Sequence, residues 1–217
     1  MSRKLCLNCE RPEKACICGF TTDIVNETHV VILQHPSEVS QSKGTVALLA
    51  KSLKSCQVIV GEDFSLSAAF LALMKRYQLL LLYPGEQAHE LNQSYIRQLA
   101  DKKRKYQCDK SKPLCLVILD GTWKKVYRMF MLNANLQELP QVYLPELLAS
   151  SGQYHIRKVN KNNALSSLEA CCYALALLEE SDNCNITPTH VGKYQLLFDK
   201  FKQFNQFQLS FRPELKI

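Results

Sequence analysis

Residues 114–123 read Leu-Cys-Leu-Val-Ile-Leu-Asp-Gly-Thr-Trp, six apolar residues followed at once by a carboxylate, a glycine, a hydroxyl and the single tryptophan of the chain. An apolar run without polar alternation is typical of a strand that is buried on both faces of a parallel sheet. Ligands of such sheets bind beyond the carboxyl ends of the strands. The sequence therefore predicts a central strand at residues 114–119, with Asp120 at its exit.

Strand-like and helix-like segments alternate on both sides of this run. Short β-branched or leucine-rich runs predict further strands at residues 30–33, 57–60, 79–83 and 141–144. Helical spacing of apolar residues predicts helices at residues 45–53, 67–77, 91–105, 122–132, 166–180 and 191–207. This alternation is typical of an α/β fold with a mostly parallel sheet and helices on both of its faces.

Four of the ten cysteines crowd into the first eighteen residues: Cys6, Cys9, Cys16 and Cys18. Four soft thiolates, in a segment too short to form a hydrophobic core, are the ligand set of a structural Zn²⁺ ion. The Cys-x-Cys spacing of the second pair is tighter than the usual Cys-x2-Cys, and surface cysteines or an iron–sulfur cluster remain as alternatives. We expect a small zinc knuckle in residues 1–25, followed by one main domain.

The sequence argues against a secreted or membrane-spanning protein. The first residues lead into no hydrophobic signal core, and the most apolar run, residues 79–83, stops at Pro84. A membrane helix needs about 20 apolar residues. We therefore expect a cytoplasmic protein with reduced cysteines and no membrane contact. Cys115, Cys171 and Cys172 are then interpreted as small buried hydrophobes.

The chain carries 27 Lys and Arg residues against 20 Asp and Glu residues, a formal net charge of +7. Any one basic cluster is typical of a solvated helix face or loop. Together the clusters favour a nucleic acid over an acidic protein as the partner. They comprise Arg97, Lys102, Lys103, Arg104, Lys105, Lys110, Lys112, Lys124, Lys125, Arg128, Arg157, Lys158 and Lys161.

Two other strand exits carry polar or turn-forming residues, His35-Pro36-Ser37-Glu38 and Pro84-Gly85-Glu86. No Gly-x-Gly-x-x-Gly occurs, so a Rossmann dinucleotide site has no support. Local alternatives stay open for the central exit. Asp120 and Thr122 have the chemistry to cap the next helix, and a lone tryptophan such as Trp123 is more often part of a core.

These motifs together resemble those of the DTW-domain family, the tRNA-uridine aminocarboxypropyltransferases of the SPOUT superfamily. Asp120-Gly121-Thr122-Trp123 matches the Asp-x-Thr-Trp signature of that family. The other matching elements, in chain order around it, are the four N-terminal cysteines, His35-Pro36-x-Glu38, Tyr83-Pro84-Gly85, Tyr154-His155-Ile156-Arg157-Lys158 and Leu165-Ser166-Ser167-Leu168-Glu169-Ala170.

This sequence departs from the family pattern at two places. After Trp123, many relatives have an Ala-Arg-Lys-type segment, whereas this chain has Val126-Tyr127-Arg128. Where relatives often have Leu-Ser-Thr, it has Leu165-Ser166-Ser167, which keeps a hydroxyl.

The resemblance implies that residues 26–217 form a catalytic domain with a SPOUT-like trefoil knot. It implies transfer of the 3-amino-3-carboxypropyl group of S-adenosylmethionine to N3 of a tRNA uridine, which leaves methylthioadenosine. Asp120 is then the carboxylate that handles the N3 proton. The implied donor contacts are Thr45, Leu82, Pro84, Thr122, Trp123, Leu144, Ser166 and Ser167, and the implied RNA contacts are Lys124, Lys125, Arg128, Arg157 and Lys158.

Several alternatives remain open at this stage. Arg157 has the chemistry to bind either the donor carboxylate or a tRNA phosphate. A methyltransferase of the SPOUT type would keep the fold and the donor, and a zinc-containing RNA-binding protein would need no catalysis. Both a monomer and a homodimer are compatible with the sequence.

Overall fold

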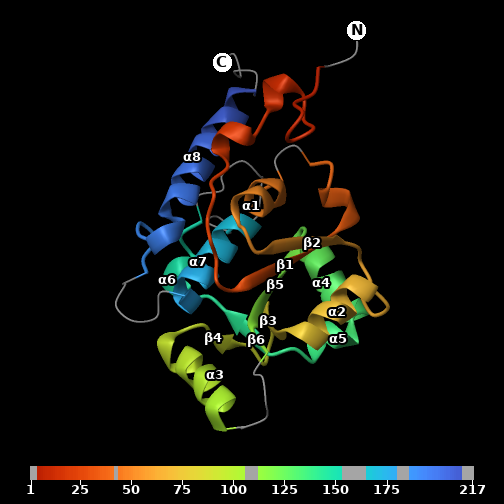
Figure 1. Cartoon of the computed structure of the whole chain (residues 1–217), viewed down its shortest axis with the longest axis vertical. Helices are drawn as coiled ribbons and strands as arrows, with labels where there is room; N and C mark the ends of the chain where they lie inside the picture. The colour runs from red at the N-terminus through yellow and green to blue at the C-terminus, as the bar shows by residue number, and fades with distance from the viewer. Residues whose placement is uncertain (1–3, 42–43, 106–111, 153–164, 180–185, 212–217) are drawn as a thin grey trace.

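The computed structural model describes residues 4–41, 44–105, 112–152, 165–179 and 186–211. Its centre is a six-stranded sheet in the order β2-β1-β5-β3-β6-β4, in which every neighbouring pair is parallel (Figure 1). The strands are β1 (His29–Gln34), β2 (Cys56–Val60), β3 (Gln78–Leu82), β4 (His89–Glu90), β5 (Leu114–Asp120) and β6 (Gln141–Tyr143). The strands expected from the sequence are all confirmed, and β4 is an additional, short edge strand.

The helices that the sequence predicts are also present. They are α1 (Val46–Ser52), α2 (Ala68–Arg76), α3 (Gln93–Lys105), α4 (Trp123–Leu132), α7 (Ser167–Glu179) and α8 (Gln195–Ser210). Short helices add to them: α5 (Ala134–Gln137), α6 (Glu146–Ala149), and the 3-10 turns η1 (Glu13–Ala15), η2 (Cys18–Phe20), η3 (Pro36–Glu38) and η4 (Gly192–Tyr194). Within the described segments, no helix is both long enough and apolar enough to cross a bilayer.

Successive residues of the central strand point into two separate apolar clusters. Leu116 and Ile118 pack into the cluster that α1, α7 and α8 cover, whereas Val117 and Leu119 pack into the cluster beneath α2, α4 and α5 (Figure 1). Both faces of β5 are therefore buried, which explains why its sequence lacks polar alternation. The expected fold class, with helices on both faces of a parallel sheet, is confirmed. Cys115, Cys171 and Cys172 are fully buried, as expected.

The N-terminal segment packs against the end of the chain. Phe20, in η2, contacts Phe204 and Phe207 of α8, with ring centroids 5.8 and 5.2 Å apart (Figure 1). Ile24 pairs with Leu53 as a parallel bridge and belongs to the main apolar cluster. The division into residues 1–25 and 26–217 stays a prediction, and so does the trefoil knot, because residues 153–164 lie outside the described residues.

A buried carboxylate fastens three segments together at the opposite end of the sheet from Asp120. Glu179, the last residue of α7, accepts hydrogen bonds from the backbone N–H groups of Glu27 and Thr28 at 3.0 and 2.7 Å. Its other oxygen accepts from the Tyr194 hydroxyl and the Lys193 ammonium, each at 2.6 Å. Charge-assisted hydrogen bonds of this kind are stronger than neutral ones.

Replacing Glu179→Ala is expected to lower the free energy of unfolding by about 3 kcal/mol, because the buried Thr28 N–H, the buried Tyr194 hydroxyl and the partly exposed Lys193 ammonium lose their acceptor. Urea denaturation measures the change. Lys202→Ala is the matched control, since Lys202 lies 3.9 Å from Asp199 on the exposed surface and such pairs contribute little. Equal midpoints for Glu179→Ala and the unmodified protein would contradict this assignment.

Candidate functional site

Asp120 lies where β1, β5 and α7 meet. It pairs in register with Gln34, the last residue of β1. Its Oδ2 accepts a hydrogen bond from Gln34 Nε2 at 3.0 Å, and its Oδ1 accepts one from the Ser167 hydroxyl at 2.5 Å. Asp120 is only 9% exposed. Since each carboxylate oxygen has two lone pairs, each keeps an acceptor site that a substrate can use.

The start of α7 is fixed by a reciprocal cap. The Ser166 backbone N–H donates to Glu169 Oε2 at 2.8 Å, and the Glu169 N–H donates to the Ser166 hydroxyl at 3.2 Å. This arrangement is a capping box, which the Ser-x-x-Glu spacing predicts. It holds the first turn of α7 in place, and with it the Ser167 hydroxyl against Asp120. The Ser166 hydroxyl accepts this capping bond, and its own hydrogen can still be donated.

The apolar residues that the resemblance implies for binding S-adenosylmethionine lie at the same edge of the sheet. Leu82 ends β3 and pairs with Ile118 and Val142 of the neighbouring strands, and it is half-buried. Leu144 is buried directly after β6, and Pro84 is exposed just beyond β3.

Three other residues that the resemblance implies for binding S-adenosylmethionine lie at the N-termini of helices. Thr45 is buried at the N-cap of α1, a helix that packs against α7. Thr122 is exposed at the N-cap of α4 but makes no side-chain capping bond there, so the capping interpretation is not supported. Trp123 is 59% exposed. Its interpretation as a core residue is wrong, because α4 turns Val126 and Met129 inward instead.

An ion-pair chain that the sequence analysis did not find lies beside this site. His35 Nε2 is 3.0 Å from Glu62 Oε1, and the second oxygen of Glu62 accepts from Arg128 Nε at 3.0 Å. His35 Nδ1 accepts from the Ser37 backbone N–H, which assigns the ring hydrogen to Nε2 in the neutral form. The hydrogen bond from Arg128 lowers the pKa of Glu62. Glu62 follows β2 in a loop without periodicity, so no sequence pattern marked it.

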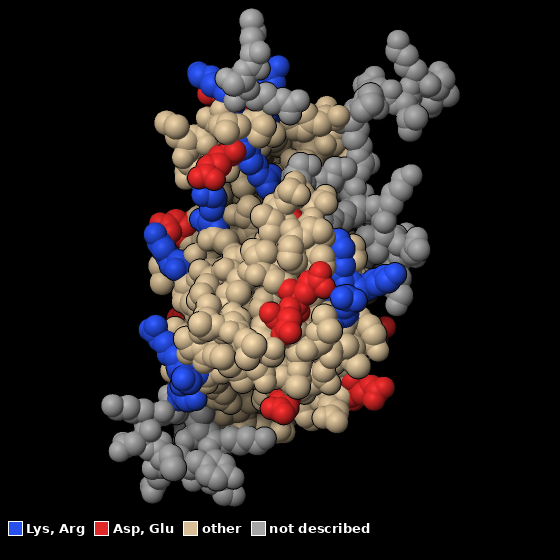
Figure 2. All heavy atoms as spheres, turned by 90° about the vertical axis from the view of Figure 1, so that its right-hand side faces the viewer, with Lys and Arg blue, Asp and Glu red and all other residues tan. Residues whose placement is uncertain are grey.

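The cations expected to contact RNA fall into three groups. Lys125 Nζ binds the buried Glu38 at 2.8 Å, and Arg128 binds Glu62. Lys124 is exposed, and Arg157 and Lys158 lie outside the described residues. Viewed from the side that carries α2, α4 and α5, the Lys and Arg side chains of the described residues form separate groups (Figure 2).

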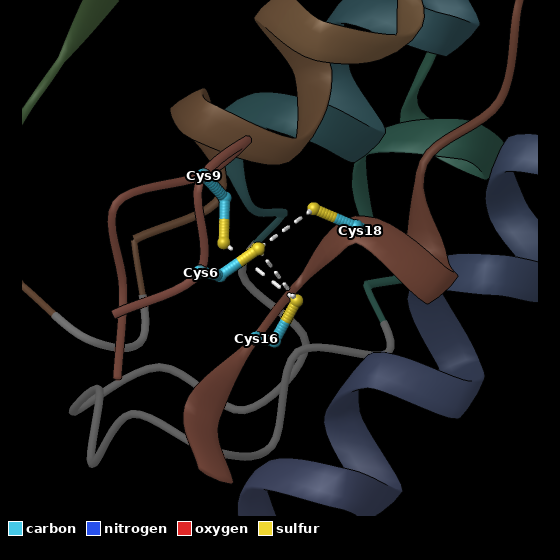
Figure 3. A group of neighbouring side chains, drawn as sticks. All are labelled: Cys6, Cys9, Cys16 and Cys18. Carbon is cyan, nitrogen blue, oxygen red and sulfur yellow. Dashed lines mark hydrogen bonds between the residues drawn. The ribbon is translucent and has the colours of Figure 1, made fainter. Parts of the chain in front are cut away.

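The four N-terminal cysteines point toward one another (Figure 3). Their sulfur atoms all lie within 4.8 Å of one another. Three Sγ–Sγ separations are 3.8 Å (Cys6–Cys18), 3.7 Å (Cys9–Cys16) and 3.5 Å (Cys6–Cys16). A tetrahedral ion with bonds of about 2.3 Å to sulfur places its ligands roughly 3.8 Å apart. Three of the separations match this geometry, and the cluster therefore fits a metal ion such as zinc.

The local backbone prepares these thiols unequally. Backbone N–H groups of Cys9 and Asn8 donate to the Cys6 sulfur and lower its pKa to about 6. Desolvation, with hydrogen bonds to neighbouring thiols, raises the pKa of Cys18 to about 12. A metal ion at the centre of the cluster would lower the pKa of all four thiols, because it stabilises every thiolate around it.

The turn between the two cysteine pairs adopts an unusual backbone conformation. Glu10 has φ 59°, in the left-handed region, and its N–H donates to the Cys6 carbonyl at 2.8 Å. A left-handed conformation costs a non-glycine residue about 1–2 kcal/mol. The turn that directs Cys6 and Cys9 toward a common centre therefore forms despite the preference of Glu10 for a negative φ.

Comparison with known proteins identifies the class to which this site belongs. The sequence profile of the DTW domain matches residues 3–209, and the chain belongs to the DTW domain family. No solved structure matches the chain significantly.

The chain is also similar to several named relatives. It is 32% identical over 186 residues to tRNA-uridine aminocarboxypropyltransferase 2 of Macaca fascicularis, which covers 83% of this chain and 58% of that protein. It is 30% identical over 207 residues to the protein of the same name from Drosophila melanogaster, covering 89% of this chain and 76% of that one. A protein of Arabidopsis thaliana, tRNA-uridine aminocarboxypropyltransferase A, is 26% identical over 132 residues, covering 58% of this chain and 50% of that protein. The chain thus spans 58% of the length of its macaque and mouse relatives.

The unequal thiols predict an ordered reactivity. In protein treated with a chelator, iodoacetamide is expected to modify Cys6 from about pH 6 upward, because only the thiolate is nucleophilic and it predominates above the pKa of about 6. Cys18 should react far more slowly at pH 7. Peptide mass spectrometry measures both rates, and the buried Cys171 serves as an unreactive control. Equal rates at Cys6 and Cys18 would contradict the prediction.

Proposed function

We propose that this protein transfers the 3-amino-3-carboxypropyl group of S-adenosylmethionine to N3 of a uridine in tRNA. The observation that carries the proposal is the Asp120 carboxylate, held by Gln34 and Ser167 at the carboxyl edge of the sheet. The names of the relatives supply the reaction class. A tRNA-modifying transferase is the general conclusion, and the transferred group and the acceptor atom are the finer part of the proposal.

Asp120 removes the obstacle to reaction at the acceptor base. N3 of uracil carries a hydrogen, and its electron pair is a poor nucleophile until that proton is withdrawn. A lone pair of the Asp120 carboxylate accepts the proton as N3 forms a bond to the terminal carbon of the aminocarboxypropyl chain. The bond between that carbon and sulfur breaks, its electron pair stays on sulfur, and neutral methylthioadenosine leaves. Water then takes the proton from Asp120.

Gln34 and Ser167 act as positioning residues for this step. Each donates one hydrogen bond to a different oxygen of Asp120, so the plane of the carboxylate is fixed before the base arrives. Preorganisation of this kind lowers the entropic cost of reaching the reactive geometry. Neither partner carries a charge, so the carboxylate keeps its capacity to attract the N3 hydrogen.

The same edge of the sheet supplies groups suited to the sulfonium donor. Leu82 and Leu144 offer apolar surface for its methyl group and adenine, and Trp123 extends that surface on the side of α4. The choice of carbon is then a matter of orientation. Hydroxyl and backbone groups complete the proposed contacts: Thr45, Pro84, Thr122, Ser166 and Ser167. The SPOUT-like trefoil knot is part of this proposal.

The proposed tRNA contacts are Lys124, Lys125 and Arg128, together with Arg157 and Lys158. For the metal cluster we propose Zn²⁺ in a structural role, because four thiolates fill a tetrahedral shell and leave no site for a substrate. The ion then adds stability to a segment that is too short to form an apolar core of its own, and that segment contacts α8 through Phe20.

Asp120→Asn is expected to reduce product formation at least a hundredfold, because the amide occupies the same space but takes no proton. The affinity for tRNA, measured by filter binding, should change little. Incubation with S-adenosylmethionine and unmodified tRNA, followed by nucleoside mass spectrometry, measures the product. Asp63→Asn is the matched control, since Asp63 is an exposed carboxylate in the loop after β2 that bonds only Ser65 among the described residues.

The by-product tests the identity of the transferred group. Methylthioadenosine supports the proposal, whereas S-adenosylhomocysteine with a methylated uridine would replace it with methyl transfer. If the unmodified protein binds tRNA and forms neither product, the chain is a binding protein and the catalytic role of Asp120 is rejected.

Cys16→Ser should lose most of the bound zinc and lower the melting temperature, because a serine hydroxyl is a poor ligand for this ion. Elemental mass spectrometry of the purified protein gives the zinc content. Cys56→Ser is the control, because Cys56 lies in β2 outside the cluster. Unchanged zinc in Cys16→Ser would remove the metal site from the proposal.

A further inference from the structure

Helix α4 presents two parallel rows of side chains to solvent. Trp123, Tyr127 and Met131 are spaced four residues apart and are 59, 58 and 52% exposed. At 100° per residue, such spacing forms one continuous stripe along the helix. Lys124 and Arg128 each follow a member of the stripe, so they form a cationic row beside it. An exposed apolar stripe next to a cationic row marks an interaction surface.

The opposite side of α4 is firmly anchored. Val126 and Met129 are buried, and the Phe130 ring stacks on Tyr83 with centroids 4.4 Å apart. After the helix, the buried Asn133 donates to the carbonyl of Glu62 at 2.8 Å and accepts from a backbone N–H in the same loop. Because these contacts fix the rotation of the helix, Trp123, Tyr127 and Met131 stay on its solvent-facing side.

The charge of α4 selects the class of occupant. The helix holds three basic and no acidic residues, Lys124, Lys125 and Arg128. A second copy of the chain docked by twofold symmetry would bring the same cationic rows close together, which disfavours that contact. A nucleic acid instead offers phosphates to the cations and bases to the apolar stripe. This is the combination by which proteins bind single-stranded nucleic acid.

The position of the stripe places this occupant next to the reacting base. α4 begins three residues after Asp120, and Trp123 to Met131 spans eight residues, or about 12 Å of helix. Trp123 already belongs to the proposed donor site, so Tyr127 and Met131 are the members left for the RNA. They lie four residues apart, or about 6 Å along the helix. At about 3.4 Å per stacked base, that length suits roughly two nucleotides.

We infer that Tyr127 and Met131 form a platform on which unpaired bases flanking the target uridine stack, with Lys124 and Arg128 binding their phosphates. The inference rests on the proposed function, because it takes tRNA as the substrate of Asp120. Arg128 uses Nε for Glu62, and a guanidinium has four further N–H donors for a phosphate. Phosphate binding therefore does not require the ion pair with Glu62 to break.

Substitution of Tyr127 by two residues separates stacking from general apolar contact. Tyr127→Phe keeps the ring and is expected to bind unmodified tRNA within about twofold of the natural protein. Tyr127→Leu keeps apolar volume without a ring, and its Kd should rise roughly 5- to 150-fold, the range measured for loss of one stacked base. Leu196→Ala, on α8 and exposed to a similar degree, is the matched control and should not change the Kd.

Salt dependence distinguishes the two rows. Stacking releases no counterions, so Tyr127→Leu should shift log Kd by the same amount at every salt concentration. Lys124→Ala should instead lower the slope of log Kd against log salt by about 0.7, the value for one phosphate contact to a single strand.

Three results would overturn the inference: equal Kd values for Tyr127→Leu and the natural protein, equal losses for Tyr127→Phe and Tyr127→Leu, or a change of sedimentation in Tyr127→Leu that reveals a dimer. Product formation by the unsubstituted protein reports on the proposed function separately. If that protein makes no aminocarboxypropyluridine while Tyr127→Leu still loses tRNA affinity, the proposed reaction fails and the platform stands.

Discussion

The hydrogen bond from the Ser167 hydroxyl to the Asp120 carboxylate is the contact on which the geometry of the candidate site depends. It joins the start of α7 to the end of the central strand, across 47 residues of sequence. Gln34 completes the arrangement from β1, in the pairing register that also places alternate residues of β1 and β5 in opposite cores. A slip of one residue would exchange those faces. The geometry of the site is therefore maintained by the packing of the whole sheet.

The fold was predictable wherever the sequence carries a repeating pattern. Unbroken apolar runs predicted the buried strands, and apolar residues at helical spacing predicted the longer helices. β4, α5 and α6 have two to four residues each, too few for any period to be visible. Trp123 shows the limit of a tendency that belongs to the residue type alone. A tryptophan is usually buried, but its place at the first turn of α4 follows from the inward direction of Val126 and Met129.

Some residues of the candidate site could likewise be predicted from a sequence pattern, and others could not. Asp120 was predictable from its position after a buried strand, and the cysteine cluster from its spacing. The cap of α7 was recognised only from the hydrogen bonds between Ser166 and Glu169, although its Ser-x-x-Glu spacing is typical of a capping box. Glu62 was not predictable, because its partners His35 and Arg128 lie 27 and 66 residues away, and only the folded sheet brings the two loops and α4 together.

The contact of Phe20 with Phe204 and Phe207 ties the first twenty residues of the chain to its last helix. An ion bound by the four sulfur atoms would share its binding free energy with that helix by linkage, because a ligand that binds only the folded state stabilises every part that unfolds with it. Loss of such an ion at one end of the fold would therefore loosen the other.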